Sequence, residues 1–178
     1  MAPIGGMIRS AKREIRYLDT GFYGLGFPHW GIEALIEAYK KFFVHFGMST
    51  VVGVQLQVSI ENLIVELGVS PQPFLLPYSK YHLRSTPGFC TRLWEKLDRY
   101  KLRLELGKQF IAPPRQHDQW LMASFEAAGY TMDDCKILNM VRLHQQVLFD
   151  SDVFNADGNT LNPRYLQPRA AGESWSSI

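Results

Sequence analysis

Apolar side chains recur at helical spacing along most of this chain, and these repeats predict its main elements. The first clear repeat begins at Ile32 and runs to Phe46 in steps of three and four residues, with charged side chains between. This spacing is typical of an amphipathic helix that turns one face toward a core. We therefore expect one face of this helix to be buried, and its apolar positions are Ile32, Leu35, Ile36, Tyr39, Phe43 and Phe46.

A second repeat follows the break at Gly47, where Ser49 or Thr50 can cap a helix. The repeat continues to Leu67 and stops at Gly68, a residue type that commonly ends helices. Several valines crowd its first turns and lower the helix propensity, so a strand at its beginning is the alternative. A helix is favoured because the later apolar positions keep the helical period.

The middle of the chain changes character twice. Residues 71–86 hold three prolines and three aromatic residues, which predicts a connector and an internal boundary. The next helix should start near Pro87 and present an apolar face as far as Tyr100. From there leucines alternate strictly with charged residues, and this alternation predicts a short strand over 101–106.

The remaining repeats predict two more helices, over roughly 115–128 and 132–148, and an extended hairpin that turns at Asp157-Gly158. The expected fold class is therefore mainly α. We expect about five helices in a compact, bundle-like domain, with a short strand or hairpin near 101–106 and 149–161.

These boundaries divide the chain into five parts, and its ending fits a piece cut from a longer polypeptide. The parts are an N-terminal turn-rich segment (1–27), a helical pair (28–70), the Pro/Tyr-rich connector (71–86), a helical subdomain with a short hairpin (87–161) and a weakly ordered tail (162–178).

Composition narrows the class of protein. The chain has 178 residues, 46% of them apolar and 20% charged, which is enough for one domain, or two small ones, with a real core. Cys90 and Cys135 show no metal-ligand spacing, so a reduced intracellular setting, cytoplasmic or nuclear, is expected. No apolar run approaches the roughly 20 residues of a membrane-spanning helix. We predict no membrane association, no metal and no other cofactor.

The net charge of +2 is modest, but the positive charge is concentrated in one segment. Residues 80–108 carry eight basic and three acidic residues, interleaved with aromatic residues. Cations can neutralise phosphates while aromatic rings stack on unpaired bases, a combination used to bind RNA and single strands. The predicted nucleic-acid-binding residues are Lys80, Arg84, Arg92, Lys96, Arg99, Lys101, Arg103 and Lys108.

A plainer interpretation of this segment stays open. Trp94 and Tyr100 fall on the apolar face of the predicted helix and would then belong to the core. The cations on its other face would keep the helix soluble beside Glu95 and Asp98.

A second set of polar residues punctuates apolar, helix-like sequence between Pro114 and Gly158. Charged groups in apolar surroundings are costly to bury alone, so these residues should pair with one another or face a ligand. Helical spacing suggests that two antiparallel helices bring Asp118 within reach of Arg142. The alternative is an active site that uses Arg115, Asp118 and Arg142 together with His117 or His144. We favour a structural polar network, and its residues are Arg115, Asp118, Asn139, Arg142 and Asp152.

No catalytic residue can be assigned from a motif. The stretch from Tyr130 to Asp134 resembles the paired aspartates of a nucleotide polymerase, but it has one residue too many and opens a helix. Thr131 with Asp134 three positions later is a helix-capping pattern instead. The acidic residues after Phe149 do not fit the register of a calcium loop, and the glycines before Pro28 do not fit a phosphate-binding loop.

An ordered series of short motifs carries a family resemblance over about Tyr17 to Trp175. The series comprises GFYGLGFPHWGIEAL, Glu66-Leu67-Gly68, Pro87 before Leu93-Trp94-Glu95, Pro114-Arg115-x-x-Asp118 with Leu121-Met122, Leu138-Asn139-x-x-Arg142, and Gln145-Gln146-Val147-Leu148-Phe149-x-Ser151-Asp152. It resembles the region downstream of the polymerase domain in reverse-transcriptase-like proteins of non-LTR retroelements.

The resemblance implies a non-catalytic accessory segment, thumb- or linker-like, of a retroelement reverse-transcriptase polyprotein. RNA or DNA and the polymerase domain of the parent protein are then the expected partners. The Tyr-x-Asp-Asp hairpin of a polymerase is missing, so these residues alone cannot perform two-metal nucleotide addition. The alternative is a protein–protein interaction module or a structural helical module with no nucleic-acid role, and the oligomeric state is left open.

Overall fold

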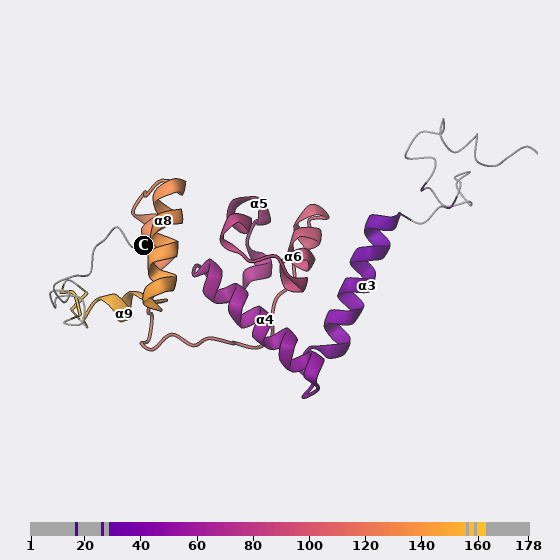
Figure 1. Ribbon diagram of the computed structural model, residues 1–178, viewed down its shortest axis with the longest axis horizontal. Coiled ribbons are helices and arrows are strands. Elements are labelled where there is room, and N and C mark those ends of the chain that lie inside the picture. The colour runs from indigo at the N-terminus through magenta and orange to yellow at the C-terminus, as the bar shows by residue number, and fades with distance from the viewer. Residues whose placement is uncertain (1–16, 18–25, 27–28, 156, 159, 163–178) are drawn as a thin grey trace, which may run out of the picture.

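The computed structural model describes residues 17, 26, 29–155, 157–158 and 160–162, and these residues are mainly helical, as predicted (Figure 1). Most of the expected N-terminal segment (1–27) and of the expected tail (162–178) lies outside the described residues. The α-helices are α3 (Trp30–His45), α4 (Val51–Leu67), α5 (Tyr78–Tyr81), α6 (Phe89–Arg99), α7 (Leu121–Ala127), α8 (Met132–Gln145) and α9 (Asp150–Val153), with 3-10 helices η2 (Pro73–Leu75) and η3 (His82–Arg84).

Helix α4 begins and ends at the residues that its sequence indicates. The Thr50 hydroxyl accepts a hydrogen bond from the Gly53 N–H at 3.1 Å, which satisfies one free donor of the first turn. At the other end Gly68 adopts a left-handed conformation with φ of +61°. The strand considered for the valine-rich first turns is therefore wrong, because these residues continue one uninterrupted helix.

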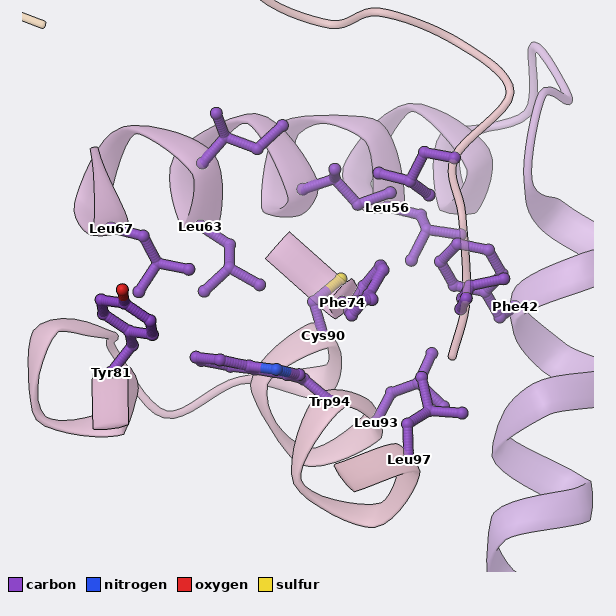
Figure 2. Close-up of a cluster of buried hydrophobic side chains, with 14 of the residues drawn as sticks. Phe42, Leu56, Leu63, Leu67, Phe74, Tyr81, Cys90, Leu93, Trp94 and Leu97 are labelled. Atoms are coloured by element: carbon purple, nitrogen blue, oxygen red, sulfur yellow. The ribbon is translucent and has the colours of Figure 1, made fainter. Parts of the chain in front are cut away.

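The apolar core lies between α4, α6 and the short helices of the connector. Figure 2 shows the Trp94 ring below α4, with Leu63 and Leu67 pointing toward it from the α4 side. The indole N–H of Trp94 donates to the Leu76 carbonyl at 2.7 Å, so its polar atom is satisfied inside the core. Helix α3 adds Phe42 to this cluster.

The predicted inward face of α3 is wrong in detail. Leu35 and Phe42 are buried, while four of the predicted core positions are exposed. On this helix the apolar residues form two neighbouring stripes about a quarter turn apart, and α4 and α6 cover only one of them. The exposed stripe consists of Ile32, Ile36, Tyr39 and Phe43.

The strand predicted over 101–106 is not formed, although its alternation of burial is present. Leu104 and Leu106 are buried and the charged residues beside them are exposed. No strand lies next to this segment in the described part of the chain. Instead the side-chain amide of Gln72 accepts from the Leu106 N–H at 2.8 Å and donates to the Leu106 carbonyl at 2.9 Å. One side chain thus replaces a partner strand.

The predicted hairpin over 149–161 is also not shown as strands. Its first residues form the one-turn helix α9, and a single antiparallel bridge joins Phe154 to Leu161. The chain turns near Gly158, which has φ of +69°.

Helix α7 is shorter than the predicted helix over 115–128. The Leu121 N–H donates to the Leu148 carbonyl at 3.0 Å, and the Asp150 N–H donates to the Gln119 carbonyl at 3.0 Å. These bonds hold Gln119 and Trp120 against the segment that follows α8, while a turn precedes them at 115–118. The prediction that the helix begins near 115 is therefore wrong, although the polar residues before Leu121 have helical spacing.

Candidate functional site

The side chain of Arg142 is buried at the C-terminal end of α4. Its exposed fraction is 2%, and it comes from α8, whose start is fixed by the predicted Thr131 cap. The guanidinium donates hydrogen bonds to the carbonyls of Val65 and Glu66, the latter at 2.9 Å. These carbonyls belong to the last turn of α4, where a helix has acceptors without partners of its own.

Asn139 lies one turn before Arg142 on α8 and completes this contact. Its Oδ1 accepts from the Arg142 Nε at 2.9 Å, and its Nδ2 donates to the Glu66 carbonyl at 3.2 Å. Asn139 therefore orients the guanidinium and binds the same helix end. The negative end of the α4 dipole favours a cation at this position.

Burial lowers the pKa of Arg142 to about 10, with a smaller contribution from the positive charge of Arg84. That value is well above neutrality, so the guanidinium is charged at pH 7. Among the described residues no carboxylate forms an ion pair with Arg142, and its acceptors are backbone carbonyls and Asn139. These hydrogen bonds join α8 to α4, and they engage the guanidinium and the Asn139 amide instead of leaving them free to react.

The expected pairing of Asp118 with Arg142 is not formed. Asp118 Oδ1 accepts from the Ser151 N–H at 3.2 Å, and Asp152 Oδ2 accepts from the N–H groups of Leu148 and Phe149, each at 2.8 Å. The two aspartates hold the backbone around the start of α9. The residues predicted as one network therefore divide into two groups, and backbone groups take the place of the charged partners that we expected.

Arg115 belongs to neither group and lines a shallow polar hollow with a volume of about 350 Å³. His117, Asp118, Asp150 and Ser151 also line this hollow. Arg142 and His144 do not, so the residues of the enzymatic alternative do not converge on one cleft. Within the described part of the chain, no three His, Cys, Asp or Glu side chains are placed to hold a metal ion.

At the start of the cationic segment, Lys80 and Arg84 both bind Glu126 of α7. The Lys80 Nζ lies 2.6 Å from Glu126 Oε2, and the Arg84 Nη1 lies 2.9 Å from Oε1. The Tyr81 hydroxyl also donates to Oε2 at 2.9 Å. The Arg84 side chain is only 5% exposed, so it is not accessible to a nucleic acid.

This cluster changes the pKa of Glu126. Burial raises it, but the hydrogen bonds from Lys80 and Tyr81 and the charge of Arg84 outweigh that effect, so the pKa is lowered overall. Glu126 stays ionised and ties α7 to α5 and η3. Sequence reasoning missed this residue, because nothing in its helical position distinguishes it from a solvated glutamate.

Three predicted cations lie on the face of α6 opposite its buried residues. Arg92 and Arg99 are exposed and Lys96 is partly exposed, at the one-face spacing of four and three residues. Arg99 pairs with Glu95 at 2.7 Å on the surface, and the Lys96 Nζ donates to the Ala34 carbonyl of α3 at 3.1 Å. Both contacts leave the charges near solvent.

The other three predicted cations follow α6 along the chain and are exposed. Arg103 donates to the Leu75 carbonyl at 2.8 Å, and Lys108 donates to Gln57 Oε1 at 3.4 Å while lying over the Phe110 ring. Lys101 is exposed with φ of +57°. Five charged groups after Arg84 are therefore exposed and a sixth, Lys96, is partly so.

The aromatic residues of the cationic segment are not placed for stacking on bases. Trp94 and Tyr81 are buried, and Tyr78 packs edge-on against Trp94 with ring centroids 5.0 Å apart. Phe89 and Tyr100 pack partly against the core. The surface of this segment thus offers charge without an aromatic platform.

Among the described helices, none combines the length and the apolar character that crossing a lipid bilayer requires. Comparison with protein-family models, with curated proteins and with solved structures finds no match to this chain.

Proposed function

We propose that this chain is a non-catalytic helical accessory module that binds the phosphate backbone of RNA or DNA. In this proposal it is a thumb- or linker-like segment of a retroelement reverse-transcriptase polyprotein, as the motif series implies, working inside the cell beside a polymerase domain. The two free, buried thiols of Cys90 and Cys135 agree with a reducing compartment.

One observation carries the nucleic-acid part of the proposal: Arg92, Lys96 and Arg99 share the outer face of α6, and more cations follow directly along the chain. Cations arranged along a surface displace counterions from a phosphate backbone without reading its sequence. Because Trp94 and Tyr81 are buried, base stacking contributes little. The expected binding is therefore sensitive to salt and tolerant of sequence.

A titration of labelled RNA and DNA oligonucleotides at several salt concentrations tests this proposal. The unchanged chain should bind at low salt, and the logarithm of its affinity should fall linearly with the logarithm of salt concentration. The variant R92E/R99E should bind at least about tenfold more weakly, with a slope smaller by about two, because two phosphate contacts are lost. Both arginines are exposed, so the fold should persist.

The matched control is R115E/K136E, which changes the net charge by the same amount at two exposed positions outside this face. It should retain most of the affinity. Absence of binding at low salt, or an equal loss in both double variants, would rule out a specific role for the α6 face.

The second candidate function is docking of another protein, and a specific observation favours it. The outward stripe of α3, Ile32, Ile36, Tyr39 and Phe43, leaves large apolar side chains 37% to 51% exposed. Contiguous apolar surface of this kind is typical of interaction sites.

A further inference from the structure

The exposed stripe of α3 has the spacing of a helix-pairing seam. Ile32, Ile36, Tyr39 and Phe43 follow one another at steps of four, three and four residues. This is the heptad spacing with which two helices pack side chains into each other along a shared line. The core of the molecule uses the neighbouring stripe of Leu35 and Phe42, so burying this seam would not compete with the fold.

We infer that a second copy of the same chain docks on this stripe, with the two α3 helices antiparallel. A twofold axis near the middle of the stripe places Ile36 opposite Tyr39 of the second copy and Ile32 opposite Phe43. Each isoleucine side chain then meets an aromatic one. The pairing is self-complementary, as an interface between identical copies requires.

The charged residues beside the stripe favour a second copy as the partner and an antiparallel orientation of its α3 helix. Glu33 and Lys40 flank the stripe on the side away from the core, seven residues apart. In the antiparallel arrangement Glu33 of each copy lies opposite Lys40 of the other, which gives two symmetric pairs of opposite charge. In a parallel arrangement the charged flank of each copy would face the uncharged flank of the other, so neither pair of opposite charges would form. The opposite flank holds no charge, because Leu35 and Phe42 turn into the core.

The existing contacts of these residues do not oppose this arrangement. Lys40 pairs with Glu37 within the helix at 2.9 Å, and both side chains are more than half exposed. Such a pair is weak and easily shared. Glu37 lies further round the helix from the stripe, so Lys40 must exchange this exposed partner for Glu33 of the second copy.

The seam is short, so the expected dimer is weak. Stable protein interfaces bury roughly 1,200 to 2,000 Å² in total, and four side chains from each copy fall at or below the lower end of that range. We expect a monomer–dimer equilibrium with a Kd on the order of 10 to 100 µM.

Analytical ultracentrifugation over a hundredfold range of chain concentration, after nuclease treatment, measures this equilibrium. The single reversals E33K and K40E should each weaken dimerisation by roughly three- to tenfold, because each puts like charges together at two symmetric positions. The double reversal E33K/K40E should restore it to within about threefold, since the pairs form again with opposite signs. I36D should abolish dimerisation, because it places a carboxylate in the seam.

The control is K136E, which makes the same charge change as K40E at an exposed position on α8 and should leave the dimer unchanged. Circular dichroism should give the same helix content for every variant. A chain that stays monomeric at all concentrations would overturn the inference, whether the stripe remains bare or another segment of the chain covers it. A dimer that ignores both single reversals, or that the double reversal does not restore, would overturn the antiparallel arrangement.

Discussion

Gly68 and Arg142 lie in direct contact: a Cβ atom at position 68 would come within 2.4 Å of the guanidinium carbon of Arg142. Gly68 ends α4 in the left-handed conformation, and Arg142 binds the carbonyls of the turn just before it. The glycine is thus required twice, once for its backbone conformation and once for the space that it leaves.

The substitution Gly68→Ala separates these two requirements. The left-handed conformation should destabilise the alanine variant by about 1 kcal/mol, because an alanine side chain disfavours this backbone geometry. The free energy of unfolding should fall by roughly a further 1 to 3 kcal/mol, because the added methyl group forces Arg142 away from its buried acceptors. The free energy of unfolding, measured in urea, should therefore fall by about 2 to 4 kcal/mol.

Gly129→Ala is the matched control, because Gly129 also has a positive φ, of +84°, but no heavy atom within 4 Å of its added Cβ. The free energy of unfolding of this variant should fall only by the backbone contribution. Equal losses at the two positions would show that the contact with Arg142 carries no energy.

Replacing Arg142 by methionine should destabilise the fold through the groups that it leaves behind. The Val65 carbonyl and the Asn139 Oδ1 would lose the guanidinium as their donor, and the Glu66 carbonyl would keep only Asn139 Nδ2. Unsatisfied buried polar groups cost roughly 1 to 3 kcal/mol each, and partial relaxation suggests a total loss of about 2 to 4 kcal/mol.

The exposed Arg115 provides the comparison, and Arg115→Met should change the free energy of unfolding by less than about 0.5 kcal/mol. The loss of stability for Arg142→Lys should lie between the losses for Arg142→Met and Arg115→Met. A lysine ammonium keeps the charge but cannot bind acceptors on both helices as the planar guanidinium does. If methionine at 142 were as stable as arginine, the polar contact would be dispensable.

The lowered pKa of Glu126 predicts that the free energy of unfolding depends on pH in the acidic range. The carboxyl has a lower pKa in the folded state than its ordinary value of 4.5, so its contribution is fully present above that value. It is lost as the pH falls from about 4.5 through the folded pKa, because the unfolded state then binds the proton more strongly. Urea unfolding at a series of pH values from 7 to 3 should show this loss.

Glu126→Gln should already be destabilised by roughly 1 to 3 kcal/mol at pH 7 and should lose less on acidification. Glu105→Gln, at an exposed carboxyl, should follow the unchanged chain at every pH. An acid profile that is the same for all three proteins would contradict the role of the Glu126 cluster.

Gln72 should control the extended segment around Leu106. Gln72→Ala removes the acceptor of the Leu106 N–H and the donor to its carbonyl. We expect a loss of about 1 to 3 kcal/mol in stability and faster hydrogen exchange of the Leu106 amide. Gln109→Ala, at an exposed glutamine, should leave that exchange rate unchanged.

The sequence predicted those parts of the fold that depend on local chemistry. The Thr50 cap, the end at Gly68 and the Thr131 cap are properties of a few neighbouring residues, and each is present. The apolar positions of α6 were also predicted, because α6 has a single apolar stripe and therefore a single face to bury.

The predictions that failed depended on contacts distant in sequence. Periodicity on α3 identifies apolar positions but cannot say which of two adjacent stripes a neighbouring helix will cover. The alternation after Tyr100 was present, but the element that pairs with it is the side chain of Gln72, which no strand pattern reveals. At the candidate site, Arg142 binds backbone carbonyls of α4, and a sequence does not record where a helix end will lie.

The core cluster around Trp94 includes no buried residue of α7 or α8 within the described chain. These helices bind the part of the molecule from α3 to α6 through polar contacts that include the Arg142 guanidinium at the end of α4 and the Glu126 carboxylate between Lys80 and Arg84. Weakening these two contacts would therefore remove no buried residue from the core cluster around Trp94. An added methyl group at Gly68, or a pH below about 4.5 at Glu126, should therefore weaken the contact between these two parts first.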